Sequence, residues 1–189
     1  LPYEMVINSD PCLGYLMREN TLLLQILTMA HVYGHNDFFK NNRLFREGTK
    51  AYYTIEMFKL DADIIRDYIN DPNIGYAKVE KILDAAHALR FQIPRVVGVK
   101  ELTQEQIKKA LIDEYNSKLE NRGPFDEKEE ITLPNLNKIP LEPCDDVMGF
   151  IIKYSSLEDW EKNILKIVKR ESEYFLPQIE TKIMNEGWA

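Results

Sequence analysis

The sequence has few of the residues that usually mark a metal or redox site, with two cysteines and three histidines among 189 residues. Cys12 and Cys144 are far apart and form no CxxC pattern, which excludes a zinc ribbon and a disulfide scaffold. The first residues, "LPYEMVINSD", lack the basic start and apolar core of a signal peptide. This cysteine usage favours a reducing compartment, so we expect a cytoplasmic protein.

Long apolar runs and an excess of basic charge are also missing. No run reaches the roughly 18 apolar residues that span a bilayer, so no transmembrane segment is expected. The 31 acidic residues outnumber the 24 basic ones, giving a net charge of −7. Nucleic-acid binding, which relies on a basic face, is therefore not expected. The sequence contains no G-x-S-x-G, P-loop or G-x-G-x-x-G pattern.

Helical periodicity dominates the chain and predicts a mainly α fold, a multi-helix single domain over 1–189. One short strand is expected within 3–11. Helices are expected from Asn20 or Thr21 to Phe39, at about 49–70 and 76–90, and from Thr103 to about 120. Two or three more follow residue 146, with Pro177 kinking the last one or starting a new one.

The segment 122–145 has a different character, with four prolines and the run "DEKEE". It predicts a long, Pro-rich, charged connection within the domain. Because the chain has no initiator Met, we interpret it as a fragment of a longer protein.

The stretch "MAHVYGHNDFFKNN" (29–42) places His31 and His35 four residues apart on one face of a helix. They continue a row that begins with Leu23 and Leu27, which predicts that they point inward, and Gly34 would permit close approach of another element. Two imidazoles at this spacing can bind one divalent metal ion, with zinc favoured. They can equally be core histidines that hydrogen-bond within the protein, and the sequence leaves both interpretations open.

The spacing is that of the H-E-x-x-H helix of zincin-like metallopeptidases, whose helical core the fold would then resemble. Val32 stands where the general-base glutamate would be, and valine cannot accept a proton from metal-bound water. Hydrolase activity therefore stays open and would need another carboxylate.

Glu186 in "NEGWA" is the candidate third metal ligand, with Gly187 allowing tight helix packing and Trp188 covering one side. Asp37, Glu56 and Glu171 are candidates for further ligands or for carboxylates that orient the metal-bound imidazoles through hydrogen bonds.

Four stretches resemble the stage V sporulation protein R (SpoVR-like) family: "EMVINSDP" (4–11), "AHVYGHNDFFKNN" (30–42), "LEDWEKNILKIV" (157–168) and "YFLPQIETKIMNEGWA" (174–189). The resemblance implies a bacterial, cytoplasmic protein that contributes with protein partners to the spore cortex, a peptidoglycan layer. It carries over no catalytic residue. Two hypotheses follow: a metal-dependent enzyme that uses His31, His35 and Glu186, or a non-catalytic regulatory or scaffold protein for cortex assembly.

Overall fold

The computed structural model describes residues 4–95, 102–121, 132, 135–138, 140–141 and 144–189. The chain divides into two compact units, one formed by 1–98 with 146–189 and the other by 99–145. Much of the predicted connection over 122–145 lies outside the described residues. Within the described part, none of the helices has the length and apolar character of a membrane span.

The mainly α prediction is confirmed, with one small sheet at the start of the first unit. That unit contains β1 (Glu4–Ile7), β2 (Leu13–Leu16), α1 (Leu22–Asn41), α2 (Arg43–Gly48), a 3₁₀ turn (Ala51–Tyr53), α3 (Thr54–Asn70), α4 (Tyr76–Ala88), α6 (Val147–Tyr154) and α7 (Asp159–Trp188). The second unit contains α5 (Gln104–Glu120), which opens with the expected capping box of Thr103 and Gln106.

Two details of the helix and strand prediction are wrong. The N-terminal stretch forms an antiparallel hairpin instead of one strand, with Glu4 opposite Leu16 and Ile7 opposite Leu13. The helix expected to start near 49 begins at Thr54, after the end of α2 at Gly48 and the 3₁₀ turn Ala51–Tyr53. We did not expect the short helix α2, whose first turn is capped by the side chain of Asn42. Of the two alternatives for Pro177, the structure places it inside α7 and not at the start of a new helix.

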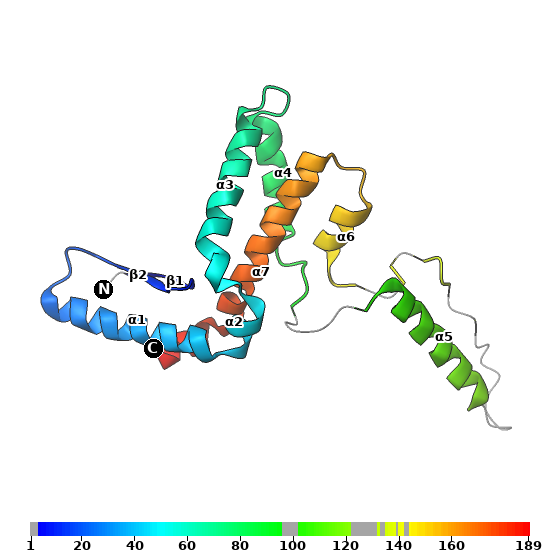
Figure 1. The fold of residues 1–189 in the computed structure, drawn as a ribbon, viewed down its shortest axis with the longest axis horizontal. Helices are drawn as coiled ribbons and strands as arrows, with labels where there is room; N and C mark the ends of the chain where they lie inside the picture. The colour runs from blue at the N-terminus through cyan, green and yellow to red at the C-terminus, as the bar shows by residue number, and fades with distance from the viewer. Residues whose placement is uncertain (1–3, 96–101, 122–131, 133–134, 139, 142–143) are drawn as a thin grey trace. The chain divides into compact units, whose positions relative to one another are not determined.

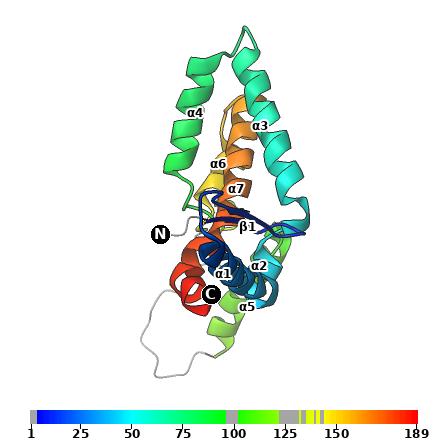
Figure 2. The same cartoon turned by 90° about the vertical axis from the view of Figure 1, so that its left-hand side faces the viewer.

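The hydrophobic core lies where α4, α6 and the first half of α7 meet, with α3 packed alongside (Figures 1 and 2). The side chains buried there include Val79, Ala86, Met148, Ile164 and Val168. Because α7 also contacts α1 and α2, it joins this core to the region that carries the histidines.

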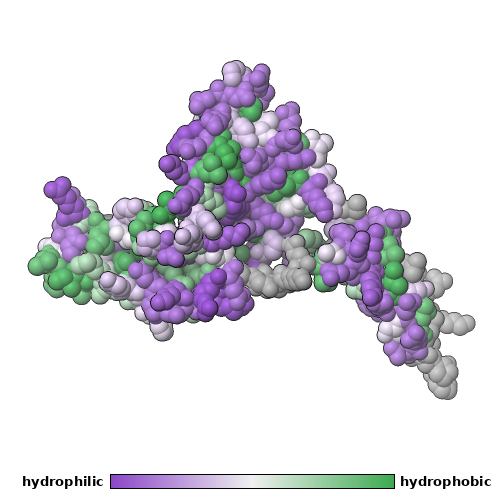
Figure 3. Space-filling view, viewed as in Figure 1, coloured by the Kyte–Doolittle hydropathy of each residue, from purple (hydrophilic) through white to green (hydrophobic). Residues whose placement is uncertain are grey.

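The predicted inward row on α1 is wrong for its first half. Leu23 and Leu27 are 66% and 56% exposed, and Figure 3 shows apolar surface at this end of the helix. The buried face instead runs through Thr28, His35 and Phe38. An α-helix turns about 100° per residue, so a row at i, i+4 drifts by about 40° per step. Leu23 therefore lies about 120° around the helix from His35.

Candidate metal centre

Residues from three parts of the chain meet beside the middle of α1. The helix supplies His31 and His35, β1 supplies Glu4, and the end of α7 supplies Asn185 and Glu186. The approach of α7 depends on Gly34, because a Cβ atom at this position would lie 2.6 Å from Cα of Ala189. The prediction that Gly34 permits close approach of another element is confirmed.

Glu4, His31 and His35 place three possible ligand atoms within 4.8 Å of one another. His31 Nε2 lies 3.1 Å from Glu4 Oε1 and 3.1 Å from His35 Nε2, and His35 Nε2 lies 3.9 Å from Glu4 Oε1. Two ligand atoms at about 2.1 Å from a tetrahedral zinc ion lie about 3.4 Å apart. The observed separations bracket this value, so the three atoms are already spaced as ligands of one ion would be.

The tautomer of the neutral His35 ring follows from its neighbour on α7. His35 Nδ1 lies 3.0 Å from Oδ1 of Asn185, an oxygen that can only accept a hydrogen bond. In the neutral ring Nδ1 therefore donates to Asn185, and Nε2 presents a lone pair toward His31 and Glu4. A hydrogen bond from the far ring nitrogen orients metal-bound histidines in the same way.

Glu186 lies at the open side of this group. Its Oε2 atom is 3.9 Å from His31 Nε2, and its side chain is 57% exposed. The structure thus brings together the three residues singled out from the sequence, His31, His35 and Glu186. The more buried Glu4 contacts both imidazoles, whereas Glu186 comes near His31.

Gly187 and Trp188, which follow Glu186, do not have the roles predicted for them from the sequence. A Cβ atom on Gly187 would meet nothing within 4 Å, so this glycine is not needed for tight packing. Trp188 is 64% exposed, and its indole N–H donates to Asp37 Oδ2 over 3.0 Å. This hydrogen bond and the contact at Gly34 fix the end of α7 against α1.

The other three carboxylates named from the sequence lie outside the group of potential ligands. Asp37 accepts hydrogen bonds from Trp188 and Asn41. Glu56 is an exposed residue in the first turn of α3. Glu171 is partly buried on α7 near His87, and its burial raises the pKa of its carboxyl group.

Sequence reasoning missed Glu4. Its signal was weak, because a single glutamate at the edge of a short strand is ordinarily solvated. The structure also explains Val32: a Cβ atom added to Gly14 of β2 would lie 3.0 Å from its Cγ1 atom. Val32 therefore packs under the hairpin, and this packing helps to hold β1, with Glu4, over the histidines.

Two comparisons with known proteins give matches. Residues 1–189 match the family model described as SpoVR like protein. The chain is also 40% identical over 202 residues to "Uncharacterized protein YcgB" of Escherichia coli (strain K12). This alignment covers 100% of the chain but 38% of the relative's length. No solved structure matches significantly.

Proposed function

We propose that this chain, which belongs to the SpoVR-like family, acts through one divalent metal ion. The family membership supports an association of the protein with sporulation. Glu4, His31 and His35 are the ligands, and zinc suits them best. The spacing of the three ligand atoms, 3.1 to 3.9 Å, carries this proposal. Two imidazoles and one carboxylate are also the protein ligands of several catalytic zinc sites, which leave a fourth position open for water or substrate.

The proposed reaction is hydrolysis, with Glu186 as the general base that Val32 cannot be. Metal binding lowers the pKa of a water molecule to about 7, so a nearby carboxylate can take its proton. Glu186 Oε2 lies 3.9 Å from His31 Nε2 on the exposed side of the group, which suits this role. We place this activity in the cytoplasm, in the formation of the spore cortex with protein partners.

A non-catalytic regulatory or scaffold role is the second candidate, and one observation favours it. His31, His35 and Glu4 can hydrogen-bond to one another without a metal ion. The proton on His31 Nε2 can be shared between His35 Nε2 and Glu4 Oε1, each 3.1 Å away. That proton lies where the metal ion would sit. The metal-dependent role therefore requires a metal ion in place of this proton, whereas the non-catalytic role keeps the proton.

To decide between the metal-dependent and the non-catalytic role, the full-length protein is equilibrated with zinc, manganese or cobalt, and its metal content is then measured by elemental analysis. We expect about one tightly bound ion per chain. The variants Glu4→Gln, His31→Ala and His35→Ala should each lower metal affinity by at least about 100-fold, since outer-shell changes alone cost 10- to 100-fold. Matched controls are His87→Ala, which changes the remaining histidine, and Glu56→Gln, which changes an exposed glutamate.

Glu186→Gln separates the two roles of that residue. It should keep the metal if Glu186 is the base and lose it if Glu186 is a ligand. Metal that persists in a His31→Ala/His35→Ala double variant would disprove the proposed site. Absence of metal from every form would establish the histidines as hydrogen-bonded core residues.

A further inference from the structure

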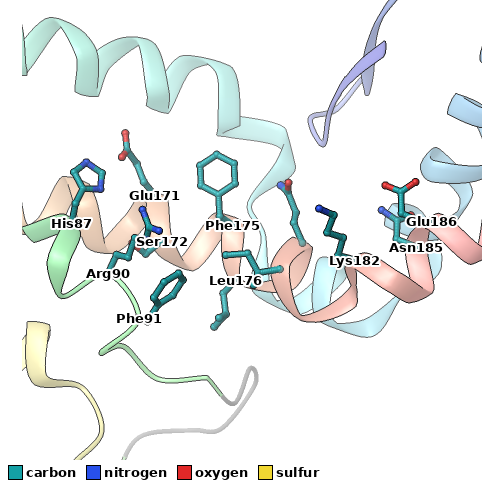
Figure 4. A pocket seen from close by; sticks show the side chains of 12 residues that line it. His87, Arg90, Phe91, Glu171, Ser172, Phe175, Leu176, Lys182, Asn185 and Glu186 are labelled. Atoms are coloured by element: carbon teal, nitrogen blue, oxygen red, sulfur yellow. The ribbon is translucent and has the colours of Figure 1, made fainter. Parts of the chain in front are cut away.

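A cavity of about 560 Å³ lies along one side of α7 (Figure 4). Its walls come from the last residues of α4, the residues that follow it, and α7 from Glu171 to Glu186. His87 and Glu171 lie at one end, and Asn185 and Glu186 lie at the other (Figure 4). The fifteen steps from Glu171 to Glu186, at about 1.5 Å rise each, make this side about 22 Å long.

The cavity reaches the candidate metal centre through two shared residues. Asn185 hydrogen-bonds with His35, and Glu186 lies 3.9 Å from His31. A molecule lying in the cavity would therefore place one end beside the imidazoles.

Two cations lining the cavity lack acidic partners among the described residues. Lys182 is one helical turn from Glu186, yet the two form no ion pair. Arg90 lies over the ring of Phe91, 4.7 Å from its centre, a contact that leaves its N–H groups available. Arg90 and Lys182 are exposed and lie between Glu171 and Glu186 along the cavity, so they offer positive charge to an anionic ligand over its middle part (Figure 4).

The rest of the lining suits a chain of amides more than a hydrocarbon chain. Phe91, Phe175 and Ile179 provide apolar contact, and Ser172 and Gln178 add a hydroxyl and an amide between them. Gln178 can donate and accept hydrogen bonds, and Asn185, whose Oδ1 atom accepts from His35, can still donate, so the two amides match a peptide backbone. At about 3.3 Å per residue, an extended peptide of six or seven residues would fill the length.

We propose that this cavity binds an extended acidic peptide, whose carboxylates pair with Arg90 and Lys182 and whose end lies beside Glu186. This assignment deepens the proposed hydrolase by naming its substrate class, but the binding itself needs no metal. Glu171 and Glu186 line the two ends of the cavity, so the carboxylates of the peptide are placed between them and an uncharged end lies beside Glu186 (Figure 4).

Isothermal titration calorimetry of the full-length protein tests the proposal with the capped hexapeptide Leu-Glu-Ala-Leu-Glu-Ala. The matched peptide carries glutamine in place of glutamate, and tetradecanoate serves as an anionic lipid. The acidic peptide should bind saturably and at least about fivefold more tightly than the glutamine peptide. Arg90→Gln and Lys182→Gln should each weaken its binding about fivefold.

Two further variants separate the cavity from the rest of the surface. Ile179→Glu places a negative charge in the lining at an exposed position, so it should weaken binding at least as much as either neutral variant. Lys59→Gln removes an exposed charge from α3, outside the cavity, and should have no effect.

Equal affinity for both peptides, no saturable binding up to about 1 mM, or loss through Lys59→Gln alone would overturn the proposal. So would tighter binding of tetradecanoate that does not depend on Lys182. Peptide binding should survive in His31→Ala, because the cavity binds the peptide without the metal. Metal content of the parent protein distinguishes the two proposals: a parent protein that binds the peptide but no metal retains the cavity and rejects the metal centre, and one that binds metal but not the peptide rejects the cavity alone.

Discussion

The two halves of α7, before and after Pro177, have the same helical backbone but opposite surroundings. The first half buries Ile164, Leu165, Ile167, Val168, Tyr174 and Leu176. Beyond Pro177, Thr181 is the buried side chain within the described chain, and Ile183 is 89% exposed. The first half is therefore held by burial of apolar surface, whereas the second half needs other contacts to hold it in place.

Those other contacts are specific and few. The second half ends where Ala189 meets Gly34 and where Trp188 donates to Asp37, and both partners are on α1. These contacts bring Asn185 and Glu186 to the histidines. The two halves of α7 therefore have different roles: the first half stabilises the fold, and the second half positions the residues of the candidate site.

The largest effect should come from the same substitution made once in each half. Ile164→Ala removes a side chain with 0% exposure and should lower the free energy of unfolding by about 2–5 kcal/mol. Ile183→Ala should change it by less than about 0.5 kcal/mol. Urea unfolding followed by circular dichroism measures both. Similar losses in the two variants would show that the second half also contributes to the core.

A second pair of variants tests how the end of α7 is positioned. Gly34→Ala places a Cβ atom 2.6 Å from Cα of Ala189, so the end of α7 must move away from α1. Because Asn185 moves with it and no longer orients His35, metal affinity should fall about 10- to 100-fold. The free energy of unfolding should change little by comparison.

Gly187→Ala is the matched control, because its new Cβ atom meets nothing within 4 Å. It should leave metal affinity unchanged and stabilise the helix by up to about 1 kcal/mol. Competition with a chromogenic zinc chelator measures the affinities. An unchanged affinity in Gly34→Ala would show that the end of α7 does not orient the site.

Several features of this arrangement could be predicted from local sequence. Thr21 and Thr103 cap the helices that they were expected to start, because hydroxyl capping depends on residues within one turn. The i, i+4 spacing of His31 and His35 brought their rings together, with centroids 4.4 Å apart, for the same reason. Membership of the SpoVR-like family was also predicted from four short motifs and is confirmed.

The remaining features depended on contacts between distant segments. Glu4 reaches the histidines because Gly14 allows the hairpin to lie on Val32, and neither residue carries that information alone. Gly34 and Gly187 are the same residue type on helices, yet one contacts Ala189 and the other faces open space. The exposure of Leu23 and Leu27 likewise depended on which neighbours cover α1, which periodicity does not state.

The smallest expected effect concerns Glu171, which lies in the first half of α7 at one end of the cavity. Burial raises the pKa of Glu171, and the nearby His87 partly offsets this. The folded state therefore binds the Glu171 proton more tightly than the unfolded state does, so its contribution to stability is complete at low pH and is lost as pH rises through the folded pKa. Glu171→Gln should be more stable than the parent protein at pH 7, and this difference should vanish below about pH 4.

Urea unfolding at a series of pH values measures that difference, with the exposed Glu56→Gln as the matched control. A Glu171→Gln variant that is less stable than the parent protein at pH 7, with a deficit that shrinks as the pH falls, would mean that the fold stabilises the Glu171 carboxylate and would contradict the assignment. The same variant should bind the acidic peptide at least as tightly as the parent protein at pH 7, because a repelling charge has been removed from the cavity. Stability and ligand binding would then both respond to one carboxyl group in the first half of α7.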